Sequence, residues 1–229
     1  MKLAIMQPYF MPYIGYWQLM AAVDKYVVYD DVNYIKGGWV ARNNILLNGQ
    51  RHMFTITLNG ASPNKLFNEI SIKDDFKKFS RLIHSAYGKA PYYAEVSKLL
   101  EKIYSYPNRS LGAFMMHSFQ VILDYLDIHT ELILSSTIEK DNSLRAKDKV
   151  KHICYLLGAD TYYNAIGGQE LYDKDDFAND GIALHFLQSN LLSYSQNTND
   201  FVPGLSIIDV LMYNGKVGTR QLLNEYTLI

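Results

Sequence analysis

Residues 3–32 read LAIMQPYFMPYIGYWQLMAAVDKYVVYDDV, and this stretch decides the fold of the chain. The apolar runs at 2–6 and 25–29 are each typical of a short buried strand. Between them, apolar side chains recur at helical spacing over 13–23, which predicts a helix that begins near Pro12. A strand, a helix and a second strand joined by short connections predict that the two strands are parallel.

The chain beyond this unit shows two interruptions of the α/β pattern. Strand-like segments on both sides of the Asn-Gly pair at 48–49 predict a hairpin over 43–58, because this pair favours a type I′ turn. Helical spacing over 75–127 is broken at Pro91 and again at 106–108. This pattern predicts three helices, which we interpret as a helical insertion.

The segment from 128 onward returns to the alternation of strands and helices. The expected strands are 131–135, 161–164 and 182–187, and the expected helices are 146–157, 207–213 and 220–226. Ser206 is expected to be the N-cap of the 207–213 helix, with Asp209 at its third position in a capping-box-like arrangement.

Strands that alternate with helices predict a parallel sheet. We therefore expect one α/β domain with a parallel, Rossmann-like (nucleotidylyltransferase-like) sheet flanked by helices. Its N-terminal half, 1–74, includes the hairpin, its C-terminal half is 128–229, and 75–127 is inserted between them.

Composition excludes several classes of protein. The net charge is -1, which gives no general attraction to nucleic acid or anionic lipid. No apolar run approaches the ~20 residues of a membrane span, and the chain opens without a secretory signal. Cys154 is the only cysteine, so no internal disulfide is possible, and its apolar neighbours predict a buried core residue. We expect a cytoplasmic protein that acts on a small molecule, without a nucleic-acid partner or a membrane span.

The candidate site lies where three strands end. In an open parallel sheet, ligands bind beyond the carboxyl ends of the strands, and the loops 7–15, 30–42 and 164–172 are rich in polar and aromatic residues there. We expect these loops to enclose one pocket. The candidate substrate-binding residues are Gln7, Tyr9, Tyr13, Gly15, Tyr16, Tyr34, Lys36, Trp39, Arg42, Asn43, Asn164, Gly167, Gly168 and Tyr172, and the candidate catalytic residues are Asp30 and Asp31. The six histidines show no metal-ligand spacing, so no metal site is expected.

The first loop carries a motif that resembles a nucleotide-binding signature. Pro12-x-x-Gly15-Tyr16 opens the first helix, as a His-x-Gly-His turn does in nucleotidylyltransferases and class I aminoacyl-tRNA synthetases. That resemblance implies a phosphate at the helix N-terminus and a ligand close to Gly15. Both histidine positions are tyrosine here, Tyr13 and Tyr16, and a tyrosine cannot supply an imidazolium. An aromatic helix start with a packing glycine explains the same residues.

The other two loops allow both functional and structural interpretations. Asp30 or Asp31 could act as a general base or could cap a turn. Arg42 could clamp a phosphate or carboxylate and Trp39 could stack on a sugar or base, or both could be structural. The glycine pair of the third loop fits anion binding by backbone amides and fits a plain tight turn equally well.

Blocks throughout the chain are similar to those of the WbqC-like family. They are Ile5 to Tyr9 with Pro12 and Gly15-Tyr16, Asp24 and Asp30-Asp31-Val32, Trp39 with Arg42-Asn43, Gly158-Ala159 with Tyr162, Gly168 to Tyr172, Tyr194-x-Gln196, Phe201-x-Pro203, and Leu205 to Asp209 followed by Asn214-Gly215. The resemblance covers almost the entire chain. It implies a bacterial protein associated with surface-polysaccharide gene clusters, and it implies addition of an amino-acyl group such as glycine to an amino sugar. It supplies no catalytic residues.

The leading hypothesis is a transferase that acts on a nucleotide-linked or carrier-linked amino sugar in the biosynthesis of an O-antigen-like lipopolysaccharide. In this hypothesis Gln7, Tyr9, Tyr16 and Arg42 bind the substrate. One of the paired aspartates deprotonates the sugar amine. A nucleotide such as ATP, or a nucleotide-sugar, is the implied ligand.

Two alternatives belong to other classes. The first is a non-catalytic protein that holds a glycan or a partner in the same aromatic cleft. The second is an ATP-dependent, carboxylate-activating enzyme, for which Arg145, Lys147 and Arg220 are candidate phosphate ligands.

Overall fold

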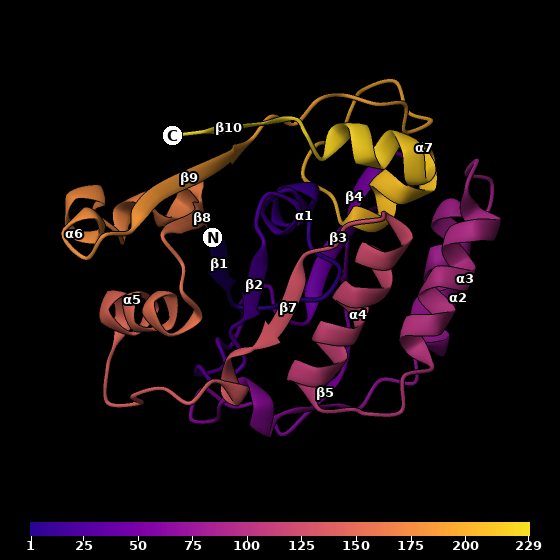
Figure 1. The fold of residues 1–229 in the computed structure, drawn as a ribbon. Helices are drawn as coiled ribbons and strands as arrows, with labels where there is room; N and C mark the ends of the chain where they lie inside the picture. The colour runs from indigo at the N-terminus through magenta and orange to yellow at the C-terminus, as the bar shows by residue number, and fades with distance from the viewer.

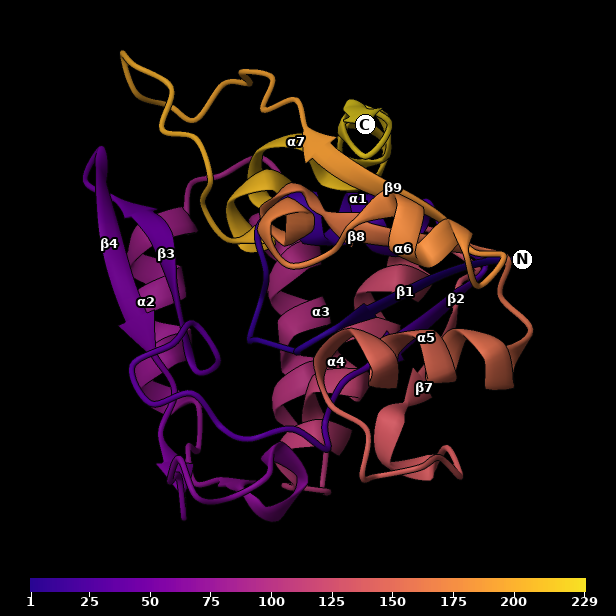
Figure 2. The ribbon, with the colours of Figure 1, turned by 90° about the vertical axis from the view of Figure 1, so that its left-hand side faces the viewer.

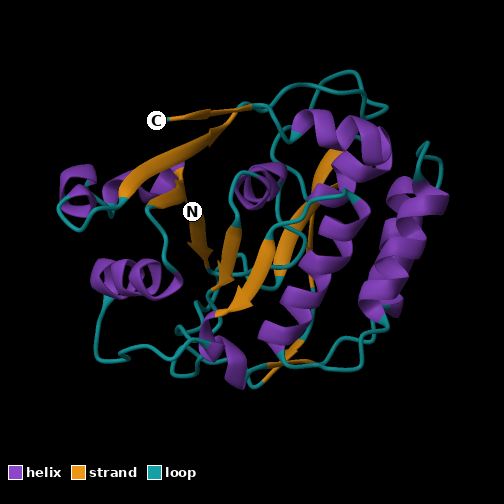
Figure 3. Ribbon diagram, in the orientation of Figure 1, coloured by secondary structure: helices purple, strands orange, loops and turns teal.

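Strands β1 (Lys2–Met6) and β2 (Lys25–Val28) lie side by side in parallel at the centre of a six-stranded sheet, as the opening stretch of sequence predicts. The computed structural model describes residues 1–229. The sheet is completed by β7 (Glu131–Leu134), β8 (Thr161–Ala165), β9 (Ala183–Ser189) and β10 (Tyr226–Leu228), in the order β10-β9-β8-β1-β2-β7. All pairings are parallel except that of β10 with β9, so the expected α/β fold with a parallel sheet is confirmed in its main features (Figures 1 and 3).

Helices cover both faces of this sheet, because successive strand residues point to opposite sides. Leu3, Ile5 and Val27 pack with α5 (Ala146–Leu157) and α6 (Lys174–Ala178). Ala4 and Tyr26 belong instead to the larger core on the other face. That face carries α1 (Ile14–Ala21), α4 (Leu111–Tyr125) and α7 (Ile207–Leu222) (Figure 1).

The predicted hairpin is present as β3 (Arg42–Leu47) and β4 (Gln50–Thr55). Asn48 and Gly49 both have positive φ angles, 51° and 75°, as a type I′ turn requires. The hairpin stands apart from the main sheet and packs beside α2 (Lys77–Tyr87) (Figure 2). A small second ribbon, β5 (Leu58–Asn59) with β6 (Ser71–Ile72), follows it.

The three helices expected between 75 and 127 are present as α2, α3 (Tyr93–Tyr104) and α4. Their apolar faces join the same 45-residue core as the α1 face of the sheet. Short 3₁₀ turns η1 (Phe67–Glu69), η2 (Ser135–Thr137) and η3 (Ile166–Glu170) complete the chain. The treatment of 75–127 as an insertion stays a prediction.

The C-terminal segment agrees with the expectation in part. The helix expected to stop at 214–215 breaks there, since Gly215 has φ 59° and ψ -162°, and a second helical stretch within α7 continues to Leu222. The ring of Tyr92 approaches to 2.5 Å of the place where a Cβ of residue 215 would stand, so only glycine fits. The helix expected over 220–226 is therefore wrong: its first part belongs to α7, and Tyr226 begins β10, which pairs antiparallel with the free edge of β9.

Candidate functional site

A cavity of about 480 Å³ lies against the loop that follows β1. Its wall comes from the start of α1, the 35–40 segment, the hairpin, and the loop between β9 and α7. The lining residues are Met6, Gln7, Pro8, Tyr9, Tyr13, Tyr16, Ile35, Gly38, Trp39, Val40, Asn43, Asn44, Arg51 and Gly204. Segments that are far apart in sequence thus converge where the first two loops were expected to meet.

Three tyrosines form the wall nearest the sheet. The rings of Tyr9 and Tyr16 meet edge to face, with centroids 5.2 Å apart. The Tyr16 hydroxyl donates to the carbonyl of Gln7 (3.2 Å), and the Tyr9 hydroxyl accepts from the backbone N–H of Tyr13 (3.1 Å). Burial raises the pKa of all three phenols, so each stays protonated and can donate a hydrogen bond.

Packing against Tyr13 requires glycine at position 15. A Cβ at this position would lie 2.5 Å from the ring of Tyr13. The space that the nucleotidylyltransferase resemblance would leave for a ligand is filled here by that ring. The geometry therefore agrees with the packing interpretation of Gly15, while Tyr13 itself lines the cavity.

The turn before α1 is held in an unfavourable backbone conformation. Met11 has φ 50°, which is uncommon for a residue with a side chain. Its carbonyl accepts hydrogen bonds from the side chains of Asn43 and Ser206. The next carbonyl, of Pro12, accepts from the Trp17 indole (3.0 Å). A strained backbone that surrounding hydrogen bonds hold in place is typical of functional sites. Here these bonds fix the loop that carries the tyrosine wall.

The segment 35–42, called the flap below, contributes Ile35, Gly38, Trp39 and Val40 to the cavity wall. Trp39 is 51% exposed and lines the cavity. Arg42 does not line the cavity: it donates to the carbonyl of Gly37, and its guanidinium lies 5.6 Å from the Trp39 ring centroid. Arg42 thus ties the flap together through Gly37 and Trp39. Tyr34 packs on Phe67, and Lys36 is exposed and lies outside the lining.

Asp30 and Asp31 also lie outside the lining. Asp30 is buried and accepts from the backbone N–H and the hydroxyl of Ser136, at 2.9 and 2.7 Å. Asp31 pairs with Lys140 (2.7 Å) and faces Lys149 at 3.9 Å. Burial acts to raise the pKa of Asp31, but the hydrogen bond and charge of Lys140 outweigh it, so the pKa lies below its ordinary value.

The third loop lies on the other face of the sheet. Asn164 is buried and accepts from the N–H of Ala165 (2.7 Å), and the backbone of Gly168 packs against its amide. Tyr172 packs on Tyr162 and on α6. Neither these residues nor the exposed Gly167 line the cavity. Loops one and two thus share a pocket, and loop three belongs to the α5 side.

Two polar lining residues were absent from the sequence-based candidates. Asn44 and Arg51 are diagonal neighbours in the hairpin ladder, in strands expected to be scaffold. Asp209 was expected in a capping box, but its carboxylate points into the core. It accepts from Tyr87, Tyr194 and Gln196 at 2.7–2.8 Å and so anchors the loop between β9 and α7. Ser206 is the N-cap, as predicted.

Other reactive groups lie apart from the cavity. Cys154 is fully buried, as expected, and burial raises the pKa of its thiol to about 12. No group of three or more His, Cys, Asp or Glu side chains is arranged to hold a metal ion. None of the helices combines the length and the apolar character needed to cross a membrane.

Comparisons with known proteins agree with the blocks seen in the sequence. The chain is 26% identical over 219 residues to the uncharacterized protein Rv1507c of Mycobacterium tuberculosis (strain ATCC 25618 / H37Rv), an alignment that covers 93% of this chain and 94% of the relative. No solved structure matches the chain. The model of the WbqC-like protein family matches residues 7–221, from the first loop to the end of α7. The chain therefore belongs to the WbqC-like protein family.

Proposed function

We propose that this protein is a transferase of bacterial surface-polysaccharide biosynthesis and that the cavity beside β1 holds the sugar of a nucleotide-linked or carrier-linked amino sugar. The observation that carries the proposal is the composition of the cavity wall: four aromatic rings, from Tyr9, Tyr13, Tyr16 and Trp39, beside the amides of Asn43 and Asn44. Flat apolar faces with a few placed polar groups suit a pyranose ring.

The place of the cavity in the fold supports a nucleotide-linked substrate. The parallel strands run in the order β9-β8-β1-β2-β7, so the chain winds outward from β1 in one direction and later returns to its other side. This is the order of doubly wound nucleotide-binding sheets, which bind ligands beyond the strand ends. It supports the Rossmann-like, nucleotidylyltransferase-like expectation, and the cavity lies beyond β1 as that expectation requires.

The transfer proposed is that of an amino-acyl group such as glycine from an activated donor to the sugar amine: the new amide bond replaces the bond to the donor's leaving group, and the amine loses one proton. The lining offers donors, acceptors and aromatic faces, so the chain would act mainly by binding and orienting the reactants. Asp30 and Asp31 contribute by holding η2 and α5 at the edge of the sheet. The lowered pKa of Asp31 makes it a weak proton acceptor.

One observation favours a second candidate, a non-catalytic glycan-binding protein. The cavity lining contains no carboxylate, no imidazole and no thiol, so no lining side chain has an ordinary pKa near neutrality. Binding of a sugar needs none of these groups. Both candidates would bind the sugar in the same pocket. Only a transferase would also convert it into a product, so a turnover assay distinguishes them.

Calorimetric titration tests the binding part of the proposal. A nucleotide, a free amino sugar and a nucleotide-linked amino sugar are titrated into the protein and into the Trp39→Ala and Tyr9→Ala variants. We expect binding of the sugar-containing ligands, weakened in both variants, and no change in Lys36→Ala, which alters the flap outside the lining. Failure of every ligand to bind would remove the proposal.

A turnover assay separates the two candidates. The protein is incubated with the best-bound amino sugar, glycine and ATP, and the sugar is analysed by mass spectrometry. Gain of the mass of a glycyl group supports the transferase. Tight binding with an unchanged sugar, across activated and free glycine donors, supports the glycan-binding protein.

A further inference from the structure

One buried side chain in the cavity wall has no partner in the protein. Asn44 is only 6% exposed. Its backbone is fully engaged, because its N–H donates to the Asn43 side chain and its carbonyl accepts from the N–H of Ser206, both at 2.8 Å. Its side-chain amide makes no hydrogen bond, yet it lines the cavity. The amide atoms of Asn44 are not among the fully buried atoms without a partner, so they are open to the cavity and can meet a ligand group that both donates and accepts.

One charged residue lines the same cavity. Arg51 on β4 is exposed, and its guanidinium donates to the carbonyl of Pro203 at 2.6 Å. That bond holds the group at the cavity rim and leaves most of its N–H donors free. No carboxylate lines the cavity to neutralise it. The rim therefore favours an anionic group on the ligand.

The hairpin register sets the distance between the two groups. Asn44 lies opposite Met53, and Leu46 lies opposite Arg51. Opposite residues of an antiparallel pair point to one face, so Asn44 and Arg51 share a face as diagonal neighbours, which lie about 7–8 Å apart with their Cβ atoms somewhat closer. A sugar ring with a phosphate at one end and a polar substituent at the other spans a gap of this kind.

We propose that the cavity is specific for a sugar that carries a phosphate. The amide of Asn44 hydrogen-bonds a hydroxyl or acylamino substituent in the depth of the cavity, and the guanidinium of Arg51 binds the phosphate at the rim. The inference rests on the proposed sugar-binding function and goes beyond it by naming the charged group and the two residues that select the substrate.

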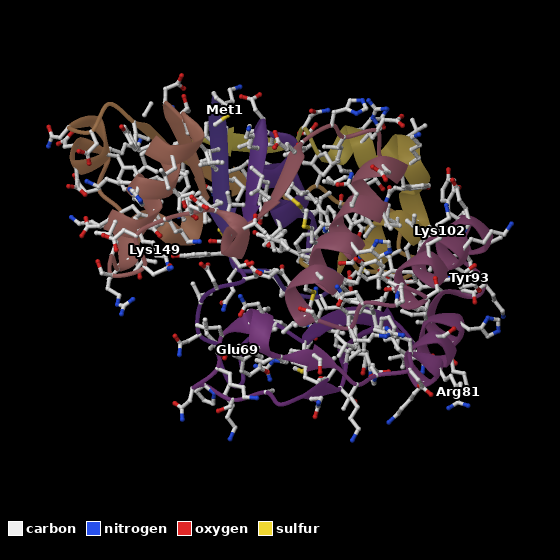
Figure 4. All side chains as sticks on the ribbon, turned by 60° about the horizontal axis from the view of Figure 1, so that its bottom comes forward. Met1, Glu69, Arg81, Tyr93, Lys102 and Lys149 are labelled. Carbon is white, nitrogen blue, oxygen red and sulfur yellow. The ribbon has the colours of Figure 1, made fainter.

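The experiment compares four probes by calorimetry at two salt concentrations: N-acetylglucosamine, its 1-phosphate, its uridine diphosphate conjugate and inorganic phosphate. We expect both phosphorylated sugars to bind at least about tenfold more tightly than the neutral sugar, as a charge-assisted hydrogen bond implies. Arg51→Gln should remove this preference and its salt dependence. The control Arg81→Gln, which changes an exposed arginine of α2 labelled in Figure 4, should retain both.

The hydrogen bond proposed between Asn44 and the sugar is tested separately. Asn44→Leu should weaken all three sugars by a similar factor and leave the preference for phosphate intact. Asn44→Ala replaces it if thermal melting shows that the leucine variant does not fold. Equal binding of neutral and phosphorylated sugars, unaffected by Arg51→Gln, overturns the inference while the sugar pocket stands. Binding of inorganic phosphate alone, with no sugar bound, overturns both proposals.

Discussion

At the scale of single residues, the buried carboxylate of Asp209 is the most heavily hydrogen-bonded acid in the molecule. Two tyrosine hydroxyls and the Gln196 amide donate to it, and one of those hydroxyls, of Tyr87, also accepts from the N–H of Leu46. This chain of bonds connects α7 with α2 and with the hairpin. Burial raises the pKa of Asp209 above its ordinary value.

The raised pKa predicts a pH dependence of stability. Because the folded state holds the proton of Asp209 more tightly than the unfolded state, its contribution to stability is greatest below the ordinary pKa of aspartate and falls as the pH rises through the folded pKa. Asp209→Asn should remove this fall. Urea unfolding of both proteins between pH 4 and 7 measures it, and parallel pH profiles would contradict the prediction.

Gly15 gives a second prediction at this scale. Alanine stabilises most helix positions relative to glycine, but here its methyl group would lie 2.5 Å from the Tyr13 ring. Gly15→Ala should therefore cost about 1–3 kcal/mol in the free energy of unfolding. Tyr13→Ala in the same chain should recover much of that loss. Gly167→Ala, where nothing lies within 4 Å, is the control and should change stability by less than about 0.5 kcal/mol.

At the scale of elements, sequence reasoning placed most strands and helices because period and turn chemistry are local properties. The hairpin followed from the Asn-Gly pair at 48–49, and the β1-α1-β2 unit followed from apolar spacing. The Asn-Gly pair at 214–215 marked the break in α7, but β10 could not be predicted, since it depends on the free edge of β9, which is distant in sequence. Asn44 and Arg51 were not predicted as site residues, because the cavity that they line is formed by segments distant in sequence.

The flap is the element whose role is most directly testable. Arg42 holds it through the carbonyl of Gly37 and the ring of Trp39, without lining the cavity. Arg42→Gln should increase hydrogen exchange at 35–41 and weaken sugar binding several-fold through loss of the ordered flap. Lys36→Gln, in the same flap, should change neither quantity. Weakened binding with unchanged exchange would instead mean that Arg42 contacts the ligand directly.

At the scale of the whole molecule, the loops that leave the sheet divide between its two faces. Strands β1, β2 and β8 are parallel neighbours, so their following loops leave one edge of the sheet, but the expected single pocket of all three loops is not formed, because no residue of 164–172 lines the cavity. Sequence reasoning could not assign the face, which depends on whether each loop turns toward the α1 layer or the α5 layer. Gln7 and Trp39 line the cavity on the α1 side, whereas Tyr172 packs with the α6 layer. Figure 4 labels Lys149 on that second side, away from Arg81 and Tyr93.

Asp31 ties the α5 layer to the sheet, and this predicts how its removal acts. The side chains of Lys140 and Lys149 are 2% and 9% exposed, so Asp31→Asn would leave two ammonium groups without their carboxylate. We expect a loss of roughly 3–5 kcal/mol, as is typical when one partner of a buried pair is removed. Because the folded pKa of Asp31 is lowered, the same stabilisation should fade in the wild type as the pH falls below the ordinary pKa of aspartate.

Urea unfolding of Asp31→Asn and of the double variant Asp31→Leu with Lys140→Met tests this role. The double variant replaces the closest charged pair with apolar groups and should recover part of the lost stability. A general base predicts another pattern: Asp31→Asn would fold with nearly wild-type stability, bind sugar normally and lose turnover. Stability and turnover of the same variant thus separate an aspartate that holds two layers together from one that takes a proton, because only the first role depends on Lys140 and Lys149.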